Sequence, residues 1–259
     1  MAEKYDEYEK ILKRMPQVKI SGSGKVSSEE VSISGSGRIL GDIETKMFKV
    51  SGSAASEGKV KAEIIRVSGS ASFYDDVEAI EVYVSGSASF RENVKCKFLK
   101  ISGSCKIHRD LIAKDYLRLS GSLSVGGNII SHGTLELRGG FKVNGNMDAN
   151  RIYVDIRDRC EVNGDIRAEN IEIIGGGEER GIILFGITIV GFKRKRNKFY
   201  TTNIYAKNTV RLENVICNNV EGSIVEIGRG CEIKGKIKYK NEVKIHPEAK
   251  ISSTPEKIV

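Results

Sequence analysis

The chain has 259 residues, of which 28 are Gly, three are Pro and none is Trp. Because its apolar residues are mainly Val, Ile and Leu, the composition favours short β-strands joined by Gly-containing turns. The net charge of +8 would suit an acidic partner, but Lys and Glu alternate along most of the chain, which is typical of a mixed, solvated surface.

The first segment, residues 1–17, is charged and contains no apolar stretch. It therefore lacks the features of a secretory signal and is predicted to form a polar tail or cap. No later segment reaches the roughly 18 consecutive apolar residues that a membrane-spanning helix needs. We expect a cytoplasmic protein that could associate with a membrane surface.

The tripeptide Ser-Gly-Ser recurs in the next segment, residues 18–174, at intervals that are mostly 17 or 18 residues. Arg138 and Arg157 continue the same phase where the tripeptide itself is lost. Such a period is typical of stacked structural units. The tripeptides begin at Ser21, Ser34, Ser51, Ser68, Ser85, Ser102 and Ser120.

Apolar residues stand at fixed positions in the repeats. Around Ser85 they are Val82 and Val84 before the tripeptide and Phe90 and Val94 after it. All of these positions lie at odd spacings from the first Ser, which is the period-2 alternation of strands and not the 3.6-residue period of helices. A unit of this length with two or three short strands matches one coil of a parallel β-helix, in which each strand pairs with its equivalent in the next coil.

The predicted fold class is therefore all-β, a right-handed parallel β-helix with a triangular cross-section and roughly a dozen coils. The right-handed form is favoured because the repeat lacks the hexapeptide period of left-handed β-helices. The middle Gly of each tripeptide lies between two inward positions, where a side chain would crowd the neighbouring coils. The first repeat is short and runs from Val26 straight to Val31, so one side of the first coil is expected to be pinched.

The repeat is interrupted at residues 175–200, where an apolar stretch, Ile182–Phe192, precedes a basic cluster. Apolar residues beside cations can dock on anionic lipid, and each cation near the surface contributes about 1 kcal/mol. The alternative is a strand pair inserted into the β-helix with a basic turn, which the alternation within the apolar stretch favours. The candidate membrane or anion contacts are Lys193, Arg194, Lys195, Arg196 and Lys198.

The phase returns in residues 201–251, which are predicted to continue the β-helix, and residues 252–259 are predicted to form a tail. The terminal coils of a β-helix leave backbone N–H and C=O groups unpaired and expose half of each apolar column. A second copy of the chain would complete both. The candidate polymerisation contacts are Val18, Ile20 and Val26 at one end and Val243, Ile245 and Ile251 at the other.

No motif predicts catalysis. His108, His132 and His246 fall at unrelated positions of the repeat, and Asp75 and Asp76 are interpreted as turn residues. Five Cys without a C-x-x-C pair argue against a zinc site and a disulfide framework, so reduced thiols that pack as small apolar residues are expected. We predict no catalytic residue, no cofactor and no metal site. The alternative, a carbohydrate- or acyl-active β-helical enzyme, would need convergent carboxylates or a His in a pocket.

Two segments resemble the repeats of the bactofilin, or polymer-forming cytoskeletal, family: GRILGDI at Gly37–Ile43 and CEVNGDIRAENIEI at Cys160–Ile173. The resemblance implies a right-handed triangular β-helix that stacks end to end into filaments without nucleotide and positions envelope or morphogenetic proteins, often beneath a membrane. The insertion and the second β block depart from the family pattern. A membrane or nucleic-acid adaptor built on the basic insertion is a further alternative, although nucleic acid is not the expected partner.

Overall fold

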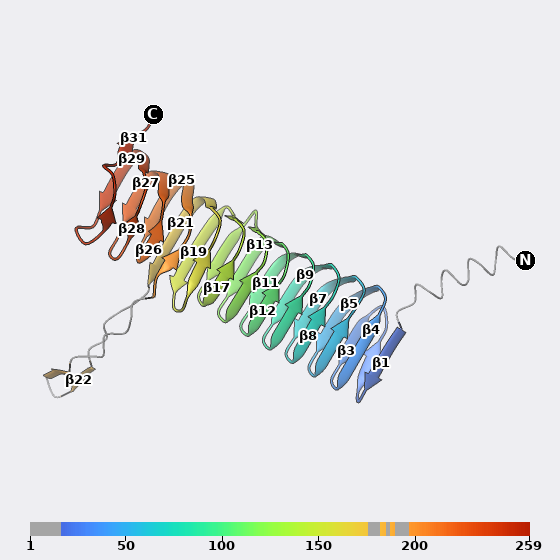
Figure 1. Ribbon diagram of the computed structural model, residues 1–259. Helices are drawn as coiled ribbons and strands as arrows, with labels where there is room; N and C mark the ends of the chain where they lie inside the picture. The colour runs from blue at the N-terminus through green and yellow to red at the C-terminus, as the bar shows by residue number, and fades with distance from the viewer. Residues whose placement is uncertain (1–16, 176–181, 185–186, 190–196) are drawn as a thin grey trace, which may run out of the picture. The chain divides into compact units, whose positions relative to one another are not determined.

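The computed structural model describes the backbone of residues 17–175, 182–184, 187–189 and 197–259. In these residues every regular element is a β-strand, and the strands build the stacked coils of a parallel β-solenoid with about 12 turns (Figure 1). The predicted all-β parallel β-helix is thus confirmed, while its right-handed sense stays a prediction. The chain divides into an amino-terminal unit that ends at Gly133 and a carboxyl-terminal unit that begins at Thr134.

Each coil of the amino-terminal unit contributes one strand to each of two surfaces, called here face A and face B. From the second coil on, the face A strand begins at the second Ser of a Ser-Gly-Ser tripeptide. Face A consists of β1 (Gln17–Ser21), β4 (Ser36–Leu40), β6 (Ser53–Ser56), β8 (Ser70–Phe73), β10 (Ser87–Phe90), β12 (Ser104–Ile107) and β14 (Ser122–Val125). Face B consists of β2 (Gly24–Val26), β3 (Glu30–Ile33), β5 (Ile43–Val50), β7 (Val60–Val67), β9 (Val77–Val84), β11 (Val94–Ile101), β13 (Leu111–Leu119) and β15 (Ile129–Ile130).

Equivalent residues of consecutive coils pair in parallel. Ser70, Ser87 and Ser104 are aligned on face A, and Val77 is aligned with Val94 on face B. This register follows from the repeat, because an apolar residue that slipped by one position would point to the solvent.

The long face B strands bend in the middle. In β9 the inward residues alternate up to Ala79 and resume at Val82, whereas Ile80 and Glu81 both face outward. The pairing of β11 with β13 is irregular at the same place, between Cys96 and Phe98. A coil therefore has three straight sides, which agrees with the predicted triangular cross-section.

The core of the amino-terminal unit is made of stacked, like side chains. Val84 and Ile101 are aligned and at most 1% exposed, and the rings of Phe73 and Phe90 are stacked in neighbouring coils. The middle Gly of each tripeptide meets the backbone of the preceding coil: a Cβ on Gly86 would overlap the carbonyl oxygens of Gly69 and Ser68. The predicted crowding at these glycines is confirmed.

The first repeat differs from the prediction. Instead of a pinched coil, β1 runs antiparallel to β4 and β2 runs antiparallel to β3. The reason is length: Ser21 and Ser34 lie too close in sequence for a full coil, whereas an antiparallel pair needs only a short turn. The turn between β2 and β3 is closed by the Ser27 amide, which donates to the Glu30 carbonyl at 2.9 Å, and by the Glu30 amide, which donates to the Ser27 Oγ at 3.1 Å.

The carboxyl-terminal unit repeats the same coil with shorter strands. One of its surfaces consists of β17 (Gly140–Val143), β20 (Cys160–Val162), β24 (Phe199–Tyr200), β26 (Val215–Cys217), β28 (Glu232–Ile233) and β30 (Lys250–Ile251). The others are β16 (Thr134–Leu137), β18 (Met147–Asp148), β19 (Arg151–Ile156), β21 (Ile166–Gly175), β25 (Asn203–Leu212), β27 (Asn219–Ile227), β29 (Ile237–Ile245) and β31 (Glu256–Lys257). Parallel pairing runs through β21, β25, β27 and β29, on both sides of the insertion.

Within the insertion, β22 (Ile182–Leu184) and β23 (Ile187–Ile189) form an antiparallel two-stranded sheet of their own. The expected strand pair is therefore present. Among the described residues, this pair is not joined to the strands of the solenoid.

Candidate functional site

The last coil of the carboxyl-terminal unit exposes side chains that every preceding coil buries. Val243 and Ile245 of β29 are half-buried, whereas the aligned Val225 and Ile227 of β27 are at most 2% exposed. Ile251 of β30 is 37% exposed. The structure thus places these three predicted contacts together on the final turn of the solenoid.

The backbone of the same coil is only partly covered. β31 pairs with Lys238 and Tyr239, and the Ile258 amide donates to the Tyr239 carbonyl at 2.8 Å. The second half of β29, residues 242–245, pairs with β27 on one side and with no other strand that the structure describes. This segment is therefore an open strand edge next to exposed apolar side chains.

The amino-terminal end is covered by the antiparallel ribbon of β1 and β2. Val18 and Ile20 are half-buried opposite Ile39 and Gly37 of β4, and Val26 is 39% exposed. The turn between the two strands contains Gly22, whose φ of 102° favours glycine. In the described residues β1 pairs only with β4 and β2 only with β3, so the ribbon has a free outer edge.

The basic cluster lies mostly outside the described residues. Lys193, Arg194, Lys195 and Arg196 belong to that segment, while Lys198 is half-buried just before β24. The neighbouring Asn197 donates from its Nδ2 to the Arg157 carbonyl at 3.0 Å. The predicted membrane or anion contact stays a prediction.

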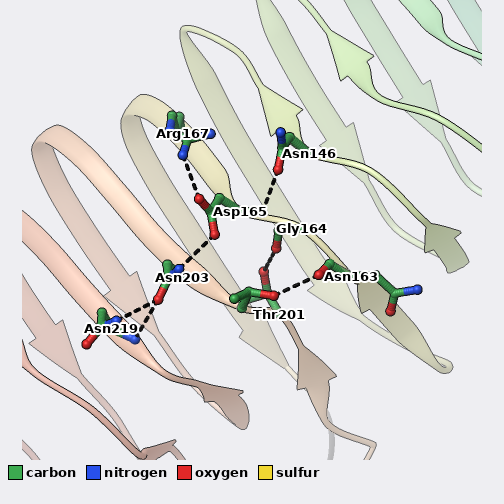
Figure 2. A network of polar contacts seen from close by, with 9 residues as sticks. Asn146, Asn163, Gly164, Asp165, Arg167, Thr201, Asn203 and Asn219 are labelled. Atoms are coloured by element: carbon green, nitrogen blue, oxygen red, sulfur yellow. Dashed lines mark hydrogen bonds and ion pairs between the residues drawn. The ribbon is translucent and has the colours of Figure 1, made fainter.

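Asp and Asn side chains of successive coils form a ladder. They lie in the turn just before β9 and in the equivalent turns of other coils. In the carboxyl-terminal unit, Asn203 donates from Nδ2 to Asp165 Oδ1 at 2.8 Å, and its Oδ1 accepts from the Nδ2 of Asn219 at 2.8 Å (Figure 2). Asn146 Oδ1 accepts from the Asp165 amide at 2.9 Å, and Asn219 Oδ1 accepts from the Lys236 amide at 2.8 Å.

The amino-terminal unit carries the same ladder. Asp76 Oδ1 accepts from the amide and Nδ2 of Asn93 at 3.1 and 3.0 Å, and Asp110 Oδ1 accepts from the amide of Asn128 at 2.7 Å. Asp76 is thus the turn residue that was expected. Each side chain closes the turn of the next coil, which is a structural role. The sequence analysis missed the ladder because it followed the inward columns; the Asp or Asn that stands eight residues after most first Ser residues would have indicated it.

The histidines and cysteines that the structure describes do not converge on one site. His108 Nδ1 lies 2.9 Å from the Phe90 carbonyl, in a coil far in sequence from His246, whose Nε2 accepts from the Arg229 Nε at 3.2 Å. All five cysteines are buried and free, and burial raises the pKa of the Cys105 thiol to about 12. Among the described residues, no three His, Cys, Asp or Glu side chains are placed to hold a metal ion, and no helix could cross a membrane.

Comparisons with models of known families, with curated proteins and with solved structures found no match to this chain.

Proposed function

We propose that this protein is a structural scaffold of the bactofilin kind, which associates with further copies of itself through the ends of its solenoid and without nucleotide. One observation carries the proposal: Val243 and Ile245 occupy columns that are buried in every earlier coil and are half-exposed in the last one. Apolar surface removed from water contributes about 25 cal/mol per Å², so a second copy stacked on this coil would be stabilised.

The strand edges support the same proposal. Residues 242–245 offer backbone N–H and C=O groups next to the exposed side chains, as an incoming strand requires. The amino-terminal ribbon changes the expected contact at the other end. β1 runs antiparallel to β4 and so against the direction of the coils. An incoming strand that keeps the direction of the coils would therefore pair antiparallel with β1.

The test is negative-stain electron microscopy and sedimentation of the purified full chain without nucleotide. We expect filaments or larger assemblies, which Ile245→Asp and Val243→Asp abolish while the circular dichroism spectrum stays that of a β-protein. The matched control is Ile80→Asp, because Ile80 is 43% exposed but lies within the solenoid on β9. A monomeric wild-type chain, or an equal loss of assembly in the control, would contradict the proposal.

A membrane contact through the basic insertion is a second candidate, supported by the clustering of Lys193, Arg194, Lys195 and Arg196 in the sequence. Cosedimentation with anionic liposomes, compared with a variant in which these four residues are Ser, tests it. Binding that is unchanged in the variant would reject this role for the cluster.

A further inference from the structure

A groove of about 320 Å³ crosses the outer surface of face B in the amino-terminal unit, over β9, β11 and β13. The side chains of Tyr83, Lys100 and Arg118 line one bank of the groove. The other bank is lined by Glu81, Phe98 and Tyr116. The residues of each bank are aligned in consecutive coils, so the groove runs across the strands.

The first bank belongs to a longer outward column of four cations and one tyrosine, of which Lys49 and Arg66 lie outside the groove. In register, the column reads Lys49, Arg66, Tyr83, Lys100 and Arg118, and it contains no carboxylate. Neighbouring strands lie about 4.8 Å apart, so aligned cations such as Lys49 and Arg66 repel each other. Lys49 and Lys100 form no ion pair with any residue that the structure describes, and the Arg66 guanidinium lies over the Tyr83 ring at 5.2 Å from its centroid.

The fold itself does not require this column. Another outward column of the same unit alternates in sign, and its Lys61 is 2.9 Å from Glu44. That alternating column reads Glu44, Lys61, Glu78 and Lys95. In the carboxyl-terminal unit, a column at the same position of the coil pairs Arg211 with Glu172 at 3.3 Å and with Glu226 at 3.7 Å. The cation column is therefore an exception, and its Lys49 and Lys100 are available to an anionic ligand.

The second bank adds aromatic surface. Phe98 is 42% exposed and is aligned with Tyr116 in the next coil. Glu81 is the carboxylate of this bank, and it accepts a hydrogen bond from the Tyr83 hydroxyl at 2.8 Å. Three rings in three consecutive coils thus lie beside the cations, and the one acidic group of the groove is already engaged.

We propose that this groove binds single-stranded nucleic acid, with phosphates along the cation column and bases stacked on Phe98 and Tyr116. Cations that follow a backbone next to aromatic rings are the combination that sequence-tolerant single-strand binding uses. A duplex hides its base faces and cannot use the rings. An acidic polysaccharide would need several hydrogen-bond acceptors for its hydroxyls, and Glu81 is engaged with Tyr83. This site is separate from the solenoid ends and does not depend on the function proposed above.

The test is fluorescence anisotropy of a labelled oligothymidine with the full chain over a range of salt concentrations. Because a single strand gives a slope of about −0.7 per phosphate contact, the three cations Lys49, Arg66 and Lys100 predict a log–log slope near −2. We expect Lys100→Glu to weaken binding more than tenfold and to reduce the slope. Phe98→Ala is expected to weaken binding about tenfold, as the loss of one stacked base does, with little change in slope.

The matched control is Lys106→Glu, which makes the same charge change at an exposed position of β12 on face A. Circular dichroism and thermal melting show that each variant is folded. Weaker binding of the oligonucleotide in Lys100→Glu than in Lys106→Glu supports the proposal. Three results would overturn it: no binding, equal losses in the two variants, or tighter binding of duplex DNA or polygalacturonate than of the oligonucleotide.

Discussion

The rings of Phe73 and Phe90 are stacked with their centroids 4.8 Å apart and their planes inclined by 5°. The two residues are aligned in neighbouring coils, so the stacking follows from the parallel register. The next residue of the same column is Ser56, aligned with Phe73. Its Oγ is buried without a hydrogen-bond partner, so this end of the aromatic column holds an unpaired polar atom.

Ser56→Ala is expected to stabilise the protein by about 1 kcal/mol, because an unpaired buried hydroxyl is removed. Thermal or urea unfolding measures the change. Thr45→Val is the control, since the Thr45 Oγ1 donates to the Ser27 carbonyl at 3.2 Å and its removal should destabilise. A lower stability of Ser56→Ala would show that this hydroxyl makes a hydrogen bond in solution.

Gly86→Ala is expected to destabilise the fold by several kcal/mol, on the order of an overpacked core site, because its Cβ would overlap the backbone of Gly69 and Ser68. Gly37→Ala is the control. A Cβ on Gly37 would meet only the side chain of Ile33, at 3.0 Å, and no backbone atom, so the cost there is expected to be much smaller. Unfolding midpoints of the two variants measure the difference, and equal midpoints would refute close coil contact at Gly86.

The cysteines are expected to be unreactive in the native protein. Burial raises the pKa from 9.0 to about 12 for the thiols of Cys96, Cys105, Cys160 and Cys217, and raises that of Cys231 as well. A thiol reagent at about pH 8 should modify none of them until denaturant is added. Rapid labelling of native protein would contradict this burial.

The same thiols predict how stability depends on pH. The pKa of these thiols is higher in the folded than in the unfolded chain. Their contribution to the free energy of unfolding is therefore complete below about pH 9 and is lost as the pH rises towards 12. Urea unfolding at increasing pH measures this loss. A Cys96→Ala, Cys105→Ala variant should show a shallower decline than the wild type.

Asn203→Asp is expected to destabilise the carboxyl-terminal unit by about 2 kcal/mol, because it removes the amide donor to Asp165 and places two carboxylates together. Asn163→Asp is the control, since Asn163 is exposed and its side chain bonds only to Asn144 Oδ1, at 3.3 Å, among the described residues. Urea unfolding measures both. If Asn163→Asp lowered the stability as much as Asn203→Asp, the ladder would have no specific role in stability.

Several surface features could not be predicted from the sequence. β1 is antiparallel to β4 because the first repeat is shorter than a full coil. The sequence could not predict this, because the short spacing from Val26 to Val31 also fits a pinched coil. The groove beside Phe98 needs two outward columns to be aligned, and outward residues have no burial requirement that would give them a pattern. Whether the basic cluster contacts a membrane depends on residues that lie outside the described part of the chain.

The amino-acid sequence alone determined the coil: the recurring Ser-Gly-Ser and the alternating apolar columns allow only like residues to stack on like, since any slip would expose the core. The tertiary structure decided what lies at the ends and on the outside. There the energy depends on which strand edge remains open and which side chains become neighbours, as for Ile245 at the last coil and Lys100 beside Phe98. Those relationships arise only when the coils are placed next to one another.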